Sequence, residues 1–282
     1  MSESDDRKFI RLALKEDVRS GDITTKAVGL GGKRGKGEVV AKEHGVISGL
    51  GPLREVFKLL SPAFGFRIRR TDGQKVKPGE RVIEISGPLD KMLIGERTSM
   101  NILCHLSGVA TLTRQFADKI SGHKAKILDT RKTMPGMRAW EKAAVRHGGG
   151  ENHRFGLFDM YLIKENHIAA AGGLEKTLKA VIKHKRTTGA KIEIEVRNLD
   201  ELRRALALDP DFILLDNFTI SNMKKAVRLA RSIGNDVILE ASGNVSLENV
   251  AGIAASGVDR ISIGRITHSA PALDLSFKVR PA

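Results

Sequence analysis

A set of cationic and hydrogen-bonding residues occupies the chain between Asp129 and His167, within D-T-R-K-T-M-P-G-M-R, A-V-R-H-G-G-G-E-N-H-R and Y-L-I-K-E-N-H. The cations are Arg131, Lys132, Arg138, Arg146, Arg154 and Lys164. They fall among turn residues and at the ends of apolar runs, whereas a solvated helix face would carry them at helical spacing and mixed with carboxylates. Arginine offers a planar fork for carboxylates, and lysine a compact charge. The segment therefore predicts a pocket for a strongly anionic molecule.

Two carboxylates follow further along the chain, each at the end of an apolar run. Glu195 lies in the run Ile192–Val196, and Asp216 follows Phe212–Leu215. Two neighbouring carboxylates and water are a typical site for Mg²⁺, which also bridges to phosphates. A pair of capping or salt-bridged acids would have the same spacing. The pattern thus favours a magnesium site without excluding a purely structural pair.

Glycine turns are the third feature that could bind a ligand. Ser242-Gly243 and Gly264 each precede a segment with helical periodicity, and backbone N–H groups at such a turn suit a phosphate. The sequence G-L-G-G-K-R-G-K-G at 29–37 does not fit the spacing of a phosphate-binding P-loop, and no strong strand precedes it. We interpret 29–37 as a basic turn.

The chain from about residue 124 alternates short apolar runs with amphipathic segments. The runs are Lys126–Leu128, Met160–Ile163, Ile192–Val196, Phe212–Leu215, Val237–Leu239 and Arg260–Ile263. The helical segments between them include Leu174–Lys185, Leu199–Leu208, Ile220–Ser232 and Leu247–Ser256. This alternation indicates βα units with a parallel sheet, and their number favours a barrel or partial barrel. The distinctive residues follow the strands, where barrel enzymes place their sites.

The first 110 residues have a different pattern. Arg7–Glu16 has helical periodicity, Gly37–Lys42 and Val82–Ile85 indicate strands, and Met92–Ile120 predicts a long helix interrupted near Gly108. The chain therefore predicts two domains of different architecture.

The composition is that of a globular protein, with 41% hydrophobic and 29% charged residues. A net charge of +15 favours anionic partners, but aromatic residues make up only 4%, which leaves few platforms for stacking nucleic-acid bases. No apolar run is long enough to span a membrane, and the acidic start lacks the pattern of a secretory signal. With Cys104 as the single cysteine, we expect a cytoplasmic protein that binds neither membrane nor nucleic acid.

Three histidines near the cationic segment raise the question of a metal site. His147, His153 and His167 match no standard ligand spacing, and His153 adjoins the positive charge of Arg154. We do not predict a histidine metal centre.

Several motifs together resemble the quinolinate phosphoribosyltransferase family, also called nicotinate-nucleotide pyrophosphorylase (carboxylating). The matching segments are E-D-V-R-S-G-D-I-T-T, E-R-T-S-M-N-I-L-C-H-L-S-G-V-A-T, D-T-R-K-T-M-P-G-M-R, G-G-G-E-N-H-R-F-G-L-F-D, L-I-K-E-N-H-I, I-L-L-D-N-F, L-E-A-S-G-N-V and G-V-D-R-I-S-I-G-R-I-T-H-S. They occur in order and cover nearly the whole chain. The resemblance implies Mg²⁺-dependent transfer of phosphoribosyl from phosphoribosyl pyrophosphate to quinolinate, giving nicotinate mononucleotide, pyrophosphate and CO₂ in de novo NAD biosynthesis.

The resemblance also implies a fold and an assembly. Residues 1–112, joined by the tail 270–282, should form an α/β sandwich, and residues 113–269 an incomplete α/β barrel, as in type II phosphoribosyltransferases. The assembly should be a homodimer with shared active sites, or a higher oligomer built from it.

For quinolinate, the resemblance implies that Arg131, Arg154 and Lys164 bind the two carboxylates, with His153 nearby. Arg97 should reach in from the other subunit.

For phosphoribosyl pyrophosphate, the resemblance implies contact with Lys132. It gives Mg²⁺ and the ribose hydroxyls to Glu195 and Asp216, so that Lys132, Glu195 and Asp216 are the expected catalytic residues. The 5′-phosphate should lie against Ser242, Gly243 and Gly264, with His268 close by.

Two positions depart from the family pattern. Asn244 stands where a second glycine is common, and Arg265 where a small residue is usual. Arg265 either adds a phosphate contact or points to solvent, and we expect solvent. Two other functions stay open: a related phosphoribosyltransferase with another acceptor, such as the molybdenum-transport-associated relatives, and a non-catalytic basic barrel that binds nucleic acid. The intact N-H-R segment and Lys164 argue against the first, since a dicarboxylate acceptor needs them.

Overall fold

The computed structural model describes residues 3–234 and 237–282, and it divides into two compact units. The first unit comprises Met1–Arg114, Met134–Gly149 and Thr267–Ala282, and the second comprises Gln115–Thr133 and Gly150–Ile266. Met1 and Ser2, the start of the predicted N-terminal domain, lie outside the described residues. The division differs from the predicted one in a single substantial way, because the segment 134–149 packs with the first unit.

The first unit is built on a four-stranded sheet in the order β12-β1-β5-β3, in which all pairs are antiparallel. The strands are β1 (Arg34–Ala41), β3 (Gly65–Ile68), β5 (Arg81–Pro88) and β12 (Leu275–Pro281), and a separate pair joins β2 (Gly45–Val46) to β4 (Lys75–Val76). The helices are α1 (Glu3–Val18), α2 (Ile23–Ala27), α3 (Leu50–Leu60), α5 (Arg138–His147) and most of α4 (Leu89–Lys119). The basic segment 29–37 is a turn only up to Lys33, after which it forms the start of β1.

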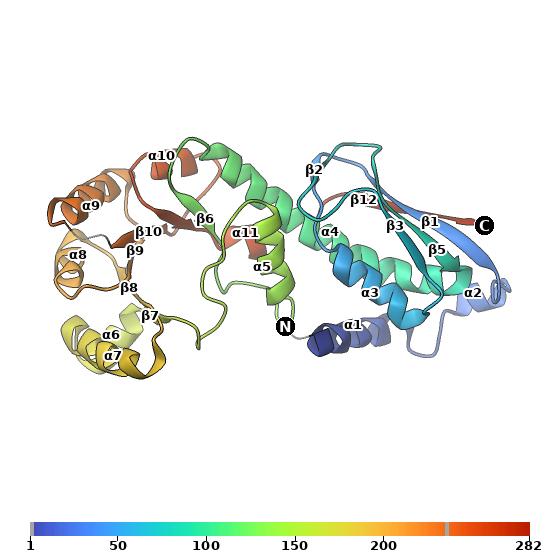
Figure 1. The fold of residues 1–282 in the computed structure, drawn as a ribbon, viewed down its shortest axis with the longest axis horizontal. Coiled ribbons are helices and arrows are strands. Elements are labelled where there is room, and N and C mark those ends of the chain that lie inside the picture. Colours follow the sequence, from blue (N-terminus) through green and yellow to red (C-terminus); the bar gives the residue numbers. More distant parts are fainter. Residues whose placement is uncertain (1–2, 235–236) are drawn as a thin grey trace. The chain divides into compact units, whose positions relative to one another are not determined.

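One face of this sheet packs against helices α3 and α4, which lie along it in Figure 1. The core between them contains Phe57 of α3, Leu103 of α4 and Ile83 of β5, all fully buried. Alternate residues of each strand point the other way, as expected for an antiparallel sheet with one solvated face.

The predicted interruption of the long helix near Gly108 is wrong, because α4 is continuous from Leu89 to Lys119. A Cβ at Gly108 would collide with the backbone carbonyl of Pro271. The glycine therefore allows the returning C-terminal segment to approach the helix closely, instead of breaking it.

The second unit contains a six-stranded parallel sheet in the order β6-β11-β10-β9-β8-β7. Its strands are β6 (Lys126–Leu128), β7 (Tyr161–Ile163), β8 (Ile192–Val196), β9 (Phe212–Asp216), β10 (Ile238–Ser242) and β11 (Arg260–Ser262). Its helices are α6 (Glu165–Ala171), α7 (Leu174–Thr188), α8 (Leu199–Leu206), α9 (Ile220–Ser232), α10 (Val250–Ala254) and α11 (Arg265–His268), the last ending across the unit boundary. All six predicted strands are confirmed. Strands and helices alternate along this unit, and the edge strands β6 and β7 are not paired with each other, so the unit is an incomplete α/β barrel (Figure 1).

The two faces of the parallel sheet differ sharply in chemistry. One face is aliphatic and buried, with residues such as Ile127, Ile194, Ile213 and Ala241. The strand register places Glu193, Glu195, Asp216, Glu240 and Ser242 together on the opposite face. Parallel sheets are normally hydrophobic on both faces, so this polar face marks the functional region.

Candidate functional site

The two predicted metal-binding carboxylates lie on adjacent strands and on the same face. Glu195 of β8 is paired with Leu214 of β9, and Asp216 lies two residues beyond Leu214. Side chains two residues apart on a strand point the same way, so both carboxylates belong to the polar face at its C-terminal edge. Ser242 of β10 is paired with Asp216 and adds a hydroxyl to the same row.

Lys164, predicted to bind the substrate, forms an ion pair with one of these carboxylates. It directly follows β7, and its Nζ lies 2.6 Å from Glu195 Oε2. The lysine side chain is 48% exposed and that of Glu195 is 14% exposed. Since β7 and β8 are neighbours, the pair links the two strand ends, and a ligand carboxylate would compete with Glu195 for the Lys164 ammonium group.

Arg154 and Arg131 carry like charges close to each other. Burial and the positive charge of Arg131 both lower the pKa of Arg154, although Glu193 and Asp159 act in the opposite direction. One Arg154 nitrogen, Nη1, donates to the carbonyl of Met160 at 3.0 Å. Its Nε is buried and has no acceptor among the described residues. Adjacent cations with an unsatisfied buried donor form an incomplete arrangement that an anion would complete.

The turn that carries Arg154 is fixed by Asp129, which follows β6 and is fully buried. The Asp129 carboxylate accepts hydrogen bonds from the Asn152 side chain at 2.5 Å and from the backbone N–H of His153 at 2.9 Å. A second strand-end residue thus orients the whole N-H-R segment.

His153 lies in a buried cluster with two glutamates from the polar face. Its Nε2 is 2.9 Å from Glu193 Oε2 and 3.4 Å from Glu240 Oε1. The side chain of His153 is 7% exposed, and those of the glutamates are 1% and 0% exposed. The backbone N–H of Arg154 donates to Nδ1 at 2.8 Å. His153 therefore turns Nε2 toward the two carboxylates and Nδ1 toward the backbone of Arg154, one of the predicted substrate-binding residues.

The cluster also brings one potential ligand atom each from His153, Glu193 and Glu240 within 4.8 Å of one another. Burial opposes a charge on His153, but the two carboxylates outweigh it and raise the pKa of His153 to about 10. Burial and the charge of Glu240 likewise raise the pKa of Glu193. In the neutral ring, Nδ1 accepts the Arg154 N–H and the proton lies on Nε2, facing the carboxylates; in the charged ring both nitrogens carry protons, and the Arg154 N–H loses this acceptor. All four carboxylate oxygens of Glu193 and Glu240 are buried without a hydrogen bond among the described residues, so His153 supplies them with a nearby charge and no well-aligned donor.

The glycine turn after β10 has left-handed backbone at two positions. Gly243 has φ 92° and Asn244 has φ 50°, and asparagine tolerates that region better than most residues. Asn217 joins this turn to the carboxylate row, since its Nδ2 donates to Asp216 at 3.0 Å and its Oδ1 accepts from Asn244 at 3.1 Å. Asn244 thus supplies the conformation that a glycine would give, together with one additional hydrogen bond.

The remaining predicted residues are distributed over both units. Exposed Lys132 follows β6, with its backbone N–H bonded to Thr130. Gly264 directly precedes α11, and Arg265 is exposed, as we expected. Arg97, exposed on α4, and His268 belong to the first unit. Of the predicted residues, the structure brings together those on the polar face and the N-H-R turn.

The comparison with known proteins decides the family. Residues 22–107 match the model of the quinolinate phosphoribosyl transferase N-terminal domain, and residues 109–278 match that of the C-terminal domain. The chain belongs to the quinolinate phosphoribosyltransferase family. The resemblance inferred from the motifs is confirmed, as is the type II phosphoribosyltransferase fold.

Relatives of this family member match over nearly their full lengths. The nicotinate-nucleotide pyrophosphorylase [carboxylating] of Mycobacterium leprae is 43% identical over 276 residues, covering 96% of both chains. A probable enzyme of the same name from Synechocystis sp. is 41% identical, covering 94% of this chain and 90% of the relative. The solved nicotinate-nucleotide pyrophosphorylase from Francisella tularensis has a TM-score of 0.92 and 40% identity, covering 99% of this chain and 98% of the other.

Sequence reasoning assigned no role to Glu193, Glu240 or Asp129. Each is a carboxylate within or directly after a buried strand, and a charge buried at such a position usually has a partner. That signal was present in I-E-I-E-V and L-E-A-S. The partner of Glu193 and Glu240 is His153. It could not be recognised from the sequence, because these three residues are brought together only by the positions of β8 and β10 in the folded sheet.

Proposed function

We propose that this chain transfers the phosphoribosyl group of phosphoribosyl pyrophosphate to quinolinate, with loss of CO₂. The observation that carries the proposal is the pair of neighbouring arginines, Arg131 and Arg154, with the buried Nε of Arg154 unsatisfied. Quinolinate is a planar dicarboxylate, and arginine forks match carboxylates in geometry and charge. The curated relatives carry the corresponding name.

Quinolinate binding engages three cations of the second unit. Arg131 and Arg154 take one carboxylate, and Lys164 takes the other after leaving Glu195. The bound dicarboxylate then satisfies Arg154 Nε and offsets the repulsion between the arginines. His153 positions Arg154 by accepting a hydrogen bond from its backbone N–H.

Phosphoribosyl pyrophosphate lies along the opposite part of the polar face. Lys132 contacts its pyrophosphate, and the turn at Ser242-Gly243 together with Gly264 holds the 5′-phosphate, with His268 nearby. Such a turn at the last strands of a barrel is a recurrent phosphate site.

Glu195 and Asp216 fit a magnesium ion. They present hard oxygen ligands from adjacent strands, and one oxygen of each is engaged by Lys164 or Asn217, which leaves the other available. A bound Mg²⁺ would supply positive charge that favours departure of pyrophosphate. The two carboxylates also face the ribose, where their charge stabilises positive character at the anomeric carbon.

The chemistry requires positioning more than a nucleophilic side chain. The lone pair of the pyridine nitrogen forms a bond to the anomeric carbon, while the bond to pyrophosphate breaks and its electrons leave with that group. The 2-carboxylate then departs as CO₂, and the electron pair left on the ring carbon takes up a proton from solvent. Holding two polyanions in register accounts for the number of cations in the site.

The proposed assembly is a cytoplasmic homodimer, or a higher oligomer built from it, in which Arg97 of one subunit serves the site of the other. None of the helices in the described residues combines the length and apolar composition that crossing a bilayer requires. Arg97 is exposed on α4, so its guanidinium is accessible to a second chain.

Activity with defined substrates tests the function. Protein supplied with quinolinate, phosphoribosyl pyrophosphate and Mg²⁺ should release CO₂ and form nicotinate mononucleotide. Turnover of nicotinate with ATP, and none of quinolinate, would overturn the substrate assignment.

Subunit complementation tests the shared site separately. Arg97→Ala and Lys164→Ala should each be inactive, whereas mixed dimers should regain part of the activity because one of their two sites is intact. Mixed dimers without activity would contradict the contribution of Arg97 to a partner's site.

A further inference from the structure

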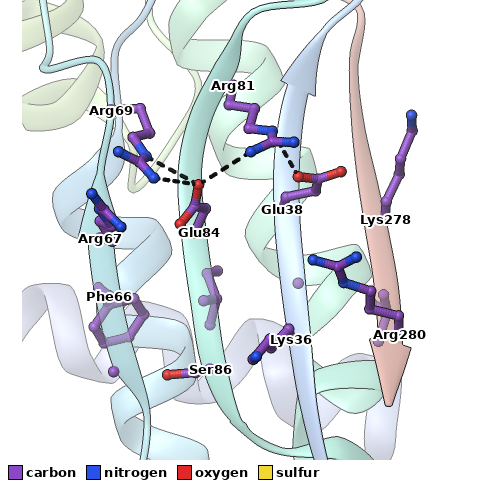
Figure 2. A pocket seen from close by; sticks show the side chains of 14 residues that line it. Lys36, Glu38, Phe66, Arg67, Arg69, Arg81, Glu84, Ser86, Lys278 and Arg280 are labelled. Atoms are coloured by element: carbon purple, nitrogen blue, oxygen red, sulfur yellow. Dashed lines mark hydrogen bonds and ion pairs between the residues drawn. The ribbon is translucent and has the colours of Figure 1, made fainter. Parts of the chain in front are cut away.

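The open face of the first unit's sheet contains a hollow of about 760 Å³. It lies over β12, β1, β5 and β3, on the side away from α3 and α4, and its volume is that of a small-molecule site. Figure 2 shows charged side chains from all four strands around it. Six of the lining residues are cationic and two are acidic, which leaves an excess of four positive charges.

The strand register sets like charges against each other at the centre of this face. Lys36 of β1 is directly opposite Arg280 of β12, and on its other side it faces Ser86 of β5. Like charges directly opposite on neighbouring strands are destabilising. In Figure 2 the Arg280 side chain leans toward β1. Among the described residues, Lys36 and Arg280 have no hydrogen bond or ion pair from their side chains, and neither has Lys278, which lies in the neighbouring row opposite Glu38.

The adjacent row of the same face is balanced. Glu38 and Glu84 are also directly opposite each other, but Arg81 bridges them at 3.0 and 3.7 Å, and Arg69 binds Glu84 at 2.8 Å. On a solvated face with no further role, we would expect every pair of opposed like charges to have a bridging counter-charge. The two carboxylates have one in Arg81, whereas Lys36 and Arg280 in the next row have none among the described residues.

We propose that this hollow binds the oligophosphate chain of a small molecule, held by Lys36, Lys278 and Arg280 with Ser86 as a hydroxyl donor. Three or four negative charges in one compact ligand match the excess of positive charge. The ligand is recognised by its phosphates, because the only aromatic lining residue, Phe66, packs toward the core against Phe57 at 6.5 Å and offers no open ring face for a base. This site is independent of the quinolinate reaction.

Calorimetric titration with inorganic tripolyphosphate tests the proposal. We expect saturable binding that weakens about tenfold or more in the double variant Lys36→Gln/Arg280→Gln, since two charge-assisted contacts are lost. The matched control, Lys179→Gln/Lys183→Gln on exposed positions of α7, removes the same charge and should bind as the unmodified protein does. Equal binding by both double variants would overturn the proposal.

Further arms identify the source and the place of binding. ATP should bind about as tightly as tripolyphosphate, and adenosine should not bind. Lys132→Ala should bind tripolyphosphate as the unmodified protein does, because Lys132 belongs to the proposed reaction site and not to the hollow. If Lys132→Ala no longer binds tripolyphosphate, the tripolyphosphate occupies the reaction site and the proposal is wrong. The proposal would also fail if tripolyphosphate did not bind, but a short duplex DNA bound to the unmodified protein and not to Lys36→Gln/Arg280→Gln. The ligand of this face would then be nucleic acid. A changed molecular mass of that variant in light scattering would instead identify the face as a subunit interface.

Discussion

The two sheets of this protein treat charge in opposite ways. On the polar face of the parallel sheet, His153 is placed between Glu193 and Glu240, and Lys164 against Glu195. On the open face of the antiparallel sheet, Lys36 faces Arg280. The first arrangement holds reactive groups in position before substrates arrive. The second leaves two opposed cations unpaired among the described residues. Arg131 and Arg154 are also neighbouring cations, although they lie in turns beside the parallel sheet, so an excess of positive charge does not by itself locate the reaction.

Removing Arg154 should have the largest effect. Arg154→Ala should lower kcat/KM for quinolinate about 100-fold or more, since truncating one member of a buried charge-paired contact costs about 2–5 kcal/mol. Arg228→Ala, at an exposed position of α9, is the control and should be close to unmodified. Steady-state kinetics at saturating phosphoribosyl pyrophosphate measure both. A change below about threefold for Arg154→Ala would contradict its role in binding quinolinate.

The buried cluster should show a graded response in stability. Glu193 is the closer partner of His153, so Glu193→Gln should lower the free energy of unfolding by about 1–3 kcal/mol, as expected for an unsatisfied buried partner. Glu240→Gln should cost less, because Glu240 lies farther from His153 Nε2, at 3.4 Å against 2.9 Å for Glu193. Urea denaturation compares them with the exposed control Asp200→Asn.

The same cluster has a kinetic signature that a packing defect would lack. Glu193→Gln should raise the KM for quinolinate more than the KM for phosphoribosyl pyrophosphate, because His153 positions Arg154. Equal changes in both KM values would reduce the cluster to a structural element.

The pH dependence of stability follows from the raised pKa of His153. The folded value of about 10 lies above the ordinary value of 6.5, so the cluster's contribution is full below about pH 6.5 and is lost as the pH rises through about 10. The difference in unfolding free energy between the unmodified protein and His153→Asn should therefore shrink from neutral to alkaline pH. A difference that grows with pH would contradict the proton placed in this cluster.

The smallest expected effects are changes in the free energy of unfolding that have opposite signs in the two rows of the antiparallel sheet. Lys36→Gln should raise the free energy of unfolding by about 0.2–1 kcal/mol in the absence of ligand, because it removes an opposed like charge. Arg69→Gln should lower it by a similar amount, because it breaks the pair with Glu84. Thermal unfolding at low ionic strength would resolve them, and equal signs would show that the two rows do not differ.

Hydrophobic periodicity was sufficient to predict the parallel sheet, since its strands are short apolar runs between amphipathic helices. It also placed Glu195 and Asp216 at neighbouring strand ends. The continuity of α4 was missed, because the role of Gly108 depends on Pro271, which is distant in sequence. The motifs gave ligand roles to Arg131, Arg154 and Lys164 and none to Arg138 and Arg146, and the last two belong to the first unit whereas the other three belong to the second. Sequence proximity could not reveal which side of that division each cation would occupy.

A diffraction measurement on crystals soaked with quinolinate tests the central claim most directly. The account predicts difference density for the dicarboxylate against Arg131 and Arg154, within hydrogen-bonding distance of Arg154 Nε, with Lys164 moved away from Glu195. Density for quinolinate only at the open face beside Lys36 and Arg280, or an unchanged Lys164–Glu195 pair beneath bound quinolinate, would contradict it.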